Sequence, residues 1–167
     1  MLPDPWFPVF PYLEAGAIEA PTTLNAAAWP IANTAIYLPV YFPSDETVYS
    51  LAFAAATGTG NYDLAFHNAD LTRIASSGSV AMVAAGTKTL ALGNVDVQAG
   101  LLYYACLSLS NVGGQVWRCP FANVRDMNAV GMGIEAAAFP IPPTLTPVAV
   151  SAAFGGVCPL LAFGVRP

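Results

Sequence analysis

The sequence predicts an all-β protein built as a single antiparallel β-sandwich. Apolar and polar residues alternate with a period of two in a series of short runs, which is typical of strands that bury one face. Clusters of Gly, Ser and Asn separate these runs at a spacing of roughly ten residues, as in β-sandwiches. Fifteen prolines interrupt the remaining apolar stretches, which leaves little room for long helices.

The chain carries few charges for its length. Only 9% of its 167 residues are charged, while 56% are hydrophobic. Ordinary soluble domains carry about 25% charged residues, so this chain cannot cover itself with a conventional polar surface. We therefore expect much of its surface to contact other copies of the chain or other proteins. The length suits one domain, which we place at residues 34–167 after an arm at residues 1–33.

The arm is predicted from the spacing of its prolines. Prolines at positions 3, 5, 8 and 11 alternate with aromatic and aliphatic residues, a pattern that favours extended backbone. An extended segment this apolar is expected to lie on its own domain or on a neighbouring subunit. The aromatic residues that would anchor it during assembly are Trp6, Phe7, Phe10 and Trp29.

The first strands follow from period-two alternation. In residues 35–42 the apolar side chains fall on one face, and Pro39 in their midst indicates an edge position or a bulge. Residues 46–54 form the next strand, with Tyr49, Leu51 and Phe53 expected on one face and Val48 on the other. A turn over residues 57–61 precedes a strand whose face Tyr62, Leu64 and Phe66 is apolar, opposite Asp63, Ala65 and His67.

The remaining elements are shorter or less regular. Further strands are expected at 71–75, 87–97 (with an irregularity at Gly93-Asn94), 101–110, 115–119 and 160–165. The strand over 101–110 has one wholly apolar face and an opposite face that ends in Cys106, Ser108 and Ser110. Residues 134–138 are the only helical turns that we expect, ended by Pro140.

Charge and patterning argue against several classes of protein. The net charge of −5 comes from ten acidic and five scattered basic residues, which form no stripe for a phosphate backbone, so nucleic-acid binding is not expected. Prolines interrupt the long uncharged stretch at 136–165, so a transmembrane helix and membrane insertion are not expected. The N-terminal residues do not have the pattern of a signal peptide, and we expect synthesis in the host cytoplasm.

The cysteines and the single histidine offer little catalytic or metal-binding potential. Cys106, Cys119 and Cys158 lack a Cys-x-x-Cys spacing, so buried free thiols are favoured over a disulfide framework or a zinc site. Any Ser-His-Asp or Cys-His machinery would depend on His67, and no G-x-S-x-G elbow accompanies it. We therefore expect His67 to be a hydrogen-bonded or solvated residue on a strand face, and the protein not to be an enzyme.

Two further motifs suggest ligands but lack the context that these ligands require. Residues 131–136 fit G-x-G-x-x-A, yet Pro140 leaves no long helix for a dinucleotide, so no cofactor is expected. Asp63, Asn68 and Asp70 could contribute oxygens to a weak calcium site, although calcium needs six to eight. Trp117 is the candidate for an aromatic platform that binds sugar rings; aromatic residues in sandwiches more often fill a core or an interface.

Two segments in the middle of the chain resemble a known family. Residues 61–78 (NYDLAFHNADLTRIASSG) and 98–107 (QAGLLYYACL) are similar to a jelly-roll module of bacteriophage structural proteins, with its Y-D-x-x-x-F strand, I-A-S-S-G turn and later G-x-Y-Y-x-A-L strand. Asn68-Ala69-Asp70 replaces the usual glycine-containing link. The resemblance implies a jelly-roll-like sandwich in a virion, as a capsid decoration, head-fibre or tail-fibre component, commonly trimeric.

Composition and resemblance together predict a structural protein. We expect a homotrimer that contacts other virion proteins, with small residues on strand faces at the three-fold contacts: Ala52, Ala54, Ala65 and Ser108. One alternative is a carbohydrate-binding or receptor-binding module, an adhesin that recognises a host surface glycan through Trp117. The other is a small hydrolase that depends on His67.

Overall fold

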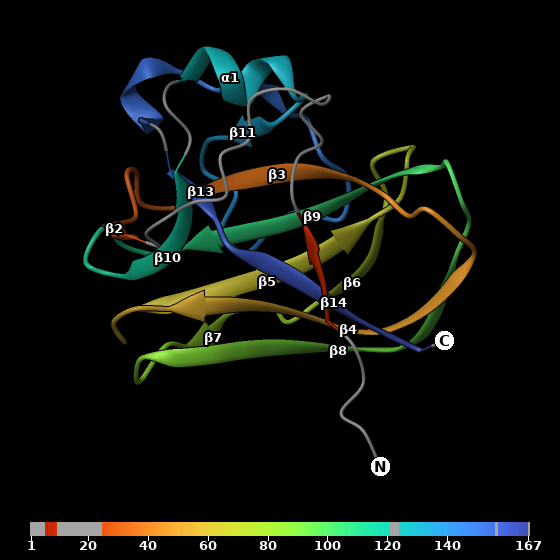
Figure 1. The fold of residues 1–167 in the computed structure, drawn as a ribbon. Coiled ribbons are helices and arrows are strands. Elements are labelled where there is room, and N and C mark those ends of the chain that lie inside the picture. The colour runs from red at the N-terminus through yellow and green to blue at the C-terminus, as the bar shows by residue number, and fades with distance from the viewer. Residues whose placement is uncertain (1–5, 10–24, 121–123, 156, 167) are drawn as a thin grey trace.

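The computed structural model describes residues 6–9, 25–120, 124–155 and 157–166. Within these residues, two antiparallel sheets of seven strands each pack face to face (Figure 1). The predicted all-β antiparallel sandwich is confirmed. The longer strands lie close to the expected positions. The two short helices of the described residues, Val124–Ala129 and Ala152–Phe154, were not predicted.

The first sheet, sheet A, has strand β4 at its centre. Its main part runs in the order β8-β4-β14-β1, and β10 joins the end of β4 through the pair Val116 and Ala55. Strands β2 and β13 flank β10 on its two sides. The strands of sheet A are β1 (Trp6–Val9), β2 (Asn25–Ala28), β4 (Glu46–Ala55), β8 (Gly86–Val97), β10 (Gln115–Pro120), β13 (Val157–Pro159) and β14 (Leu161–Arg166).

The second sheet, sheet B, runs in the order β12-β11-β3-β9-β5-β6, and β7 also pairs with β5. Its strands are β3 (Thr34–Tyr41), β5 (Asn61–His67), β6 (Arg73–Ser76), β7 (Val80–Ala81), β9 (Leu102–Leu109), β11 (Gly133–Glu135) and β12 (Val148–Ala149). The α-helix α1 (Val124–Ala129) and the 3-10 helix η1 (Ala152–Phe154) lie at one end of the sandwich (Figure 1).

The longer strands from β3 to β10 alternate between the two sheets, whereas the short strands β6 and β7 stay in sheet B with β5. The chain passes from β3 in sheet B to β4 in sheet A and back to β5 in sheet B, and later from β8 to β9 in the same way. Each long strand therefore pairs with a strand that is distant in the sequence, as β4 does with β8 and β5 with β9. The side chains that face inward from both sheets are brought together from the whole chain.

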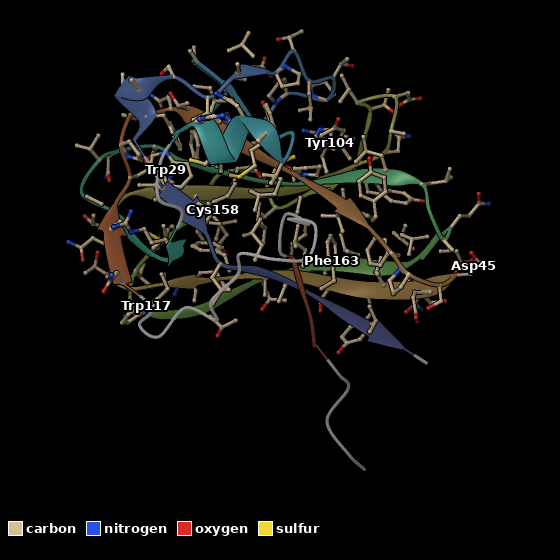
Figure 2. All side chains as sticks on the ribbon, turned by 45° about the horizontal axis from the view of Figure 1, so that its top comes forward. Trp29, Asp45, Tyr104, Trp117, Cys158 and Phe163 are labelled. Atoms are coloured by element: carbon tan, nitrogen blue, oxygen red, sulfur yellow. The ribbon has the colours of Figure 1, made fainter. Side chains whose placement is uncertain are left out.

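The core between the sheets is built around aromatic rings. The Phe163 ring centroid lies 5.3 Å from that of Phe42 and 4.9 Å from that of Phe66, both in edge-to-face geometry. Tyr103 stacks on Phe66 at 5.6 Å. Figure 2 shows Phe163 between the two sheets. Such contacts add about 0.5–1.5 kcal/mol each to the free energy of burial.

Strand β4 departs from the expected alternation at Tyr49. Both of its ladders shift register between Val48 and Ser50, so Tyr49 has no Cα partner. The irregularity places Val48 in the core at 0% exposure, together with Leu51, and not on the opposite face as the sequence predicted. On the facing strand β8, Gly93 and Asn94 have positive φ angles of 69° and 66°, so the irregularity predicted there is present.

The expected helical turns at residues 134–138 are wrong. Gly133–Glu135 forms strand β11, in which Ile134 pairs with Ile36 on one side and Val148 on the other. Ala137 has a left-handed φ of 55°, which ends any regular run before Pro140. Strand pairing has overridden the helical preference of the alanines. The G-x-G-x-x-A motif therefore lies on a strand and a turn, which is not the geometry of a dinucleotide site.

Two described parts of residues 1–33 are strands of sheet A, namely β1 and β2. Trp6 to Val9 pair with Gly164 to Leu161 of β14, and Asn25 to Ala28 pair with β10. The sequence left open whether this region lies on its own domain or on a neighbouring subunit. Strands β1 and β2 lie on their own domain. Phe10 lies outside the described residues, as do the side chains of Trp6 and Phe7.

Candidate functional site

The outer face of sheet B gathers most of the buried polar side chains of the described chain. Asp63 and His67 point outward from β5, Cys106 and Ser108 from the neighbouring strand β9, and Tyr37 from β3. All five are 0% exposed. A sheet face that carries such groups is normally open to solvent, so a further segment must cover it.

The covering residues come from the C-terminal third of the chain. Ala138, Ile141 and Leu145 pack against Ala35, Tyr37, Ala65 and Cys106 in a second apolar cluster, separate from the core between the sheets. Leu71 and Tyr104 lie at its border. We refer to residues 138–146 as the cover segment. They lie on the side of sheet B that faces away from sheet A.

Side chains of sheet B and one short backbone bridge, between Thr72 and Thr144, hold the cover segment, because its prolines prevent longer strand pairing. Pro140, Pro142 and Pro143 have no N–H group. The N–H of Ile141 donates to Asp63 Oδ2 at 2.8 Å. Its carbonyl accepts from Arg73 Nη1 at 3.0 Å, and the Pro143 carbonyl accepts from the Arg73 N–H at 2.8 Å. Each of these backbone groups, which has no partner in a regular strand ladder, thus makes its own hydrogen bond to a residue of sheet B.

His67 makes two hydrogen bonds that fix its tautomer. Its Nε2 lies 3.2 Å from the Pro142 carbonyl, which can only accept, so Nε2 carries the hydrogen. Nδ1 is then the bare nitrogen, 3.4 Å from Cys106 Sγ, and it accepts the thiol hydrogen. Burial lowers the pKa of His67 and raises the pKa of the Cys106 thiol well above its ordinary value. The pair is therefore neutral at physiological pH.

A neutral, enclosed Cys-His pair is poorly suited to nucleophilic catalysis. A reactive cysteine needs a thiolate, which a positive neighbour or a helix N-terminus normally supplies, and access for a substrate. His67 and Cys106 are both neutral, so neither ionises the other, and both are 0% exposed. The arrangement therefore gives no support to a hydrolase that depends on His67. What it does is attach the cover segment to sheet B.

A second anchor is formed by Glu135, at the end of β11. Its Oε2 accepts hydrogen bonds from Tyr37 Oη at 2.7 Å and from the Thr146 N–H at 2.9 Å, and its Oε1 accepts one from Thr146 Oγ1 at 2.8 Å. Partial burial acts to raise the pKa of Glu135, but these hydrogen bonds outweigh it and hold the pKa below its ordinary value. Glu135 is thus ionised, and its carboxylate binds the end of the cover segment at Thr146.

The two aspartates of the proposed calcium site serve different parts of the structure. Asp63 Oδ1 accepts from the hydroxyls of Ser76 and Ser77 under the cover segment. Asp70 lies on an exposed turn, where its Oδ1 accepts from the N–H and hydroxyl of Thr72. No group of three or more His, Cys, Asp or Glu side chains suited to a metal ion occurs among the residues described.

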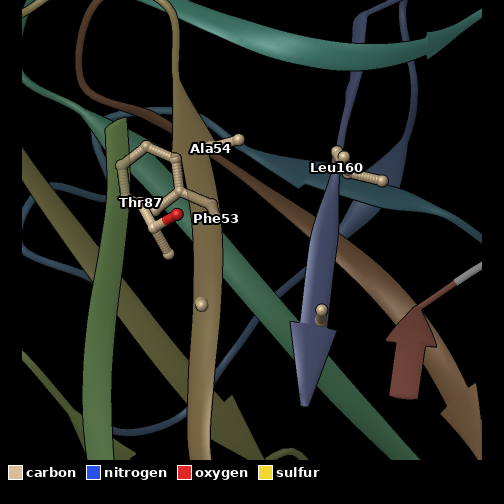
Figure 3. A pocket seen from close by; sticks show the side chains of 6 residues that line it. Phe53, Ala54, Thr87 and Leu160 are labelled. Carbon is tan, nitrogen blue, oxygen red and sulfur yellow. The ribbon is translucent and has the colours of Figure 1, made fainter. Parts of the chain in front are cut away.

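The middle of the outer face of sheet A is different, because it is apolar and formed by small side chains. Ala52 on β4 faces Ala162 on β14 and Thr89 on β8, and Ala54 faces Thr87. These strands surround a hollow of about 300 Å³, lined by Ala52, Phe53, Ala54, Thr87, Leu160 and Ala162 (Figure 3). None of the lining residues is charged. A second sheet or an apolar segment could approach this face closely.

Comparisons with protein-family models, with curated proteins and with solved structures gave no match. The function must therefore be argued from this chain alone. Among the helices described, none has the length and apolar character needed to cross a membrane.

Three of the four small residues proposed for three-fold contacts are buried within the single chain. Ala52 and Ala54 line the hollow of sheet A, where Ala52 is 4% exposed and Ala54 is half-buried. Ala65 and Ser108 are 0% exposed on sheet B, in the face that the cover segment hides. The hydroxyl of Ser108 is buried without a hydrogen-bond partner. The two pairs lie on opposite sides of the sandwich, which the sequence did not reveal.

The two described tryptophans that were singled out in the sequence have different environments (Figure 2). Trp29 is 1% exposed, donates from Nε1 to the Thr34 carbonyl at 3.1 Å, and packs edge-on against Phe154. Its side chain is enclosed by its own chain, so in this arrangement it does not face a neighbouring subunit. Trp117 on β10 is 38% exposed and is accessible to a ligand or a partner.

Proposed function

We propose that this protein is a non-enzymatic structural subunit that assembles with copies of itself, as a capsid decoration, head-fibre or tail-fibre component of a virion. The observation that supports self-association is the uncharged middle of the outer face of sheet A, away from the exposed Asp96 at the end of β8. Its central residues are Ala52, Ala54 and Ala162, flanked by Thr87 and Thr89. On sheet B the cover segment occupies the outer face, so the sheet presents no comparable apolar face to a second copy.

Electrostatics favours this face as the contact between copies. The chain carries a net charge of −5, so two copies repel each other wherever their acidic groups meet. An interface without charges avoids that cost. It also removes apolar surface from water, which stabilises the complex. Small side chains also permit close approach of two sheets, about 10 Å apart. A homotrimer is the expected assembly.

The virion role rests on the resemblance of residues 61–78 and 98–107 to phage jelly-roll modules and on the low charge of the chain. Subunits of a particle place much of their surface against neighbours, so they can be poorer in charge than free proteins. Other virion proteins are then the expected partners, and the virion is the expected location.

Light scattering coupled to gel filtration tests self-association. The wild-type chain is expected to run as a trimer whose mass does not change with concentration. Thr87→Glu places a charge at the rim of the hollow on a side chain that is already exposed, and it should shift the population to monomers. Val148→Glu is the matched control, because Val148 is 61% exposed on an edge strand of sheet B. A monomeric wild type, or equal effects of both variants, would contradict the proposal.

The exposure of Trp117 supports a second candidate function, a carbohydrate-binding or receptor-binding module. An indole that is 38% exposed on a strand can stack on the apolar face of a sugar ring. A glycan array with the soluble protein tests this function. A signal that Trp117→Ala abolishes, while Tyr41→Ala leaves it intact, would support it; Tyr41 is 54% exposed on the other sheet.

A further inference from the structure

Three ionisable side chains of sheet B hold the backbone of one short segment. His67 bonds to the carbonyl of Pro142, Asp63 to the N–H of Ile141, and Glu135 to the N–H and hydroxyl of Thr146. Acid acts on two of these groups: a proton on the imidazole would place a charge in a site that is 0% exposed, and a proton on Glu135 would weaken its bonds to Thr146. A segment held in this way responds to acid differently from one held by apolar packing alone.

We propose that the cover segment, residues 138–146, is released in acid: protonation of His67 and then of Glu135 detaches it from sheet B and exposes the apolar face beneath. This inference does not depend on the proposed assembly role. It concerns the opposite side of the sandwich from the hollow of sheet A.

The first step concerns the environment of His67. A proton can add only to Nδ1, which then loses its role as acceptor for the Cys106 thiol. The charge would form at a site that is 0% exposed and beside Arg73 on β6. Asp63 on β5 and Glu135 on β11 partly offset it, while the facing groups from β9 and β3 are the uncharged Cys106, Tyr104 and Tyr37.

Proton binding at His67 and release of the cover segment are coupled, and the pKa in each form gives the direction of the coupling. Burial holds the pKa of His67 below its ordinary 6.5 in the covered form, and release of the segment restores water to the ring. The released form therefore binds the proton more tightly. The contribution of His67 to the covered form is complete above pH 6.5 and is lost as the pH falls through the lowered pKa.

Glu135 acts in the same direction at lower pH. Its pKa lies below the ordinary 4.5 in the covered form, because the hydrogen bonds from Thr146 and Tyr37 favour the carboxylate. Release breaks the two bonds from Thr146 and so raises the pKa toward its ordinary value, whereas the bond from Tyr37 lies within sheet B and remains. The contribution of Glu135 is thus present above pH 4.5 and is lost below it. Acid therefore favours the released form through both groups: through the burial of the charge at His67 and through the loss of the bonds from Thr146 at Glu135.

Release of the segment need not unfold the sandwich. The core between the sheets is formed by apolar side chains and contains no Asp, Glu, His, Lys or Arg among its buried members. The cover segment contributes only Ala138, Ile141 and Leu145 to the second cluster. Local opening draws on parts of a structure with few buried apolar contacts, and this cluster is much smaller than the core between the sheets.

Selective labelling of Cys106 tests the proposal with the full chain. 4,4′-Dithiodipyridine reacts with thiols in mild acid, and mass spectrometry of peptic peptides assigns the label to each cysteine. Cys106 lies under the cover segment, whereas Cys158 is 0% exposed in the core between the sheets and reports opening of the whole sandwich. Between pH 7.5 and pH 4, labelling of Cys106, corrected for the intrinsic reactivity of a free thiol at each pH, should rise about tenfold or more. Cys158 should stay protected.

Three variants and one further measurement identify the groups responsible. His67→Gln keeps an N–H donor for Pro142 but cannot gain a proton, so the rise in labelling should move to lower pH. Glu135→Gln should remove the later part of the rise. Glu46→Gln is the matched control, because Glu46 bonds to Ser44 away from the cover segment. If a variant fails to fold, hydrogen exchange of the Ile141 amide in the wild type, corrected for intrinsic rates, gives the same information.

The outcomes are distinct. Labelling of Cys106 in acid ahead of Cys158, delayed by His67→Gln and unchanged by Glu46→Gln, supports the proposal. Simultaneous labelling of both cysteines means that acid unfolds the sandwich as a whole, and it would overturn the proposal. Protection of Cys106 down to pH 4 would overturn it equally.

Discussion

The Sγ atom of Cys106 lies 3.4 Å from Nδ1 of His67, although the two residues are 39 positions apart in the chain. The pairing arises because β5 and β9 are neighbours and both residues point away from the main core. The same imidazole reaches Pro142 with its other nitrogen. One histidine thus connects two strands of sheet B to the cover segment, and the thiol is its hydrogen-bond donor and not a nucleophile.

Replacement of Cys106 should reveal this role. Cys106→Ala leaves His67 Nδ1 without a donor in a buried site, and we expect a loss of about 1–3 kcal/mol in the free energy of unfolding. Cys106→Ser restores an O–H donor at the same position and should recover most of that loss. Urea unfolding monitored by circular dichroism measures both. Equal losses in the two variants would show that the thiol contributes packing and not a hydrogen bond.

Asp63 should be the most important polar residue of the covered face. It accepts hydrogen bonds from Ser76, Ser77 and the Ile141 N–H while 0% exposed. Asp63→Ala leaves these donors unpaired, and we expect a loss of about 3 kcal/mol in the free energy of unfolding. Asp96→Ala is the control, because its hydrogen bond from Thr47 is exposed to solvent. Similar small losses in both variants would contradict the assignment.

The strands and the main core could be predicted from the sequence, because alternation reports directly which side chains are buried. The apolar faces at Ile36 and Leu38 and at Tyr62 and Leu64 are all in the core between the sheets. Alternation fails where both faces are buried. In residues 62–67 the sequence placed Asp63, Ala65 and His67 on the face opposite the apolar one, and these are all 0% exposed.

The candidate site could not be predicted because its parts meet only through pairing between distant strands. Cys106 and His67 were each noted in the sequence, but nothing in their own segments indicates that β5 and β9 are adjacent. The cover segment has no periodicity, since its prolines exclude both helix and regular strand. Its position depends on side chains of other elements, above all Asp63 and Arg73. The irregularity at Tyr49 was missed for a similar reason, because it arises in the ladders with β8 and β14.

Trp29 should stabilise the fold and not the contact between copies. Its side chain is buried against Phe154 and bonded to the Thr34 carbonyl within one chain. Trp29→Phe keeps an aromatic ring there and should cost less than Trp29→Ala, for which we expect a loss of about 3–5 kcal/mol. Under conditions in which Trp29→Phe remains folded, light scattering should give the same oligomeric state as the wild type. A change in that state would place Trp29 at an assembly contact after all.

The thiol of Cys106 should also make stability depend on pH in the alkaline range. Burial raises its pKa well above the ordinary value of 9.0 in the folded chain, whereas unfolding restores that value. The unfolded chain therefore loses the proton first as the pH rises. The contribution of the thiol to stability is complete below pH 9 and is lost progressively above it. Urea midpoints at pH 7.5 and pH 9.5 should fall more for the wild type than for Cys106→Ser, which has no group that titrates in this range. Equal decreases would mean that Cys106 is already accessible to solvent in the folded protein.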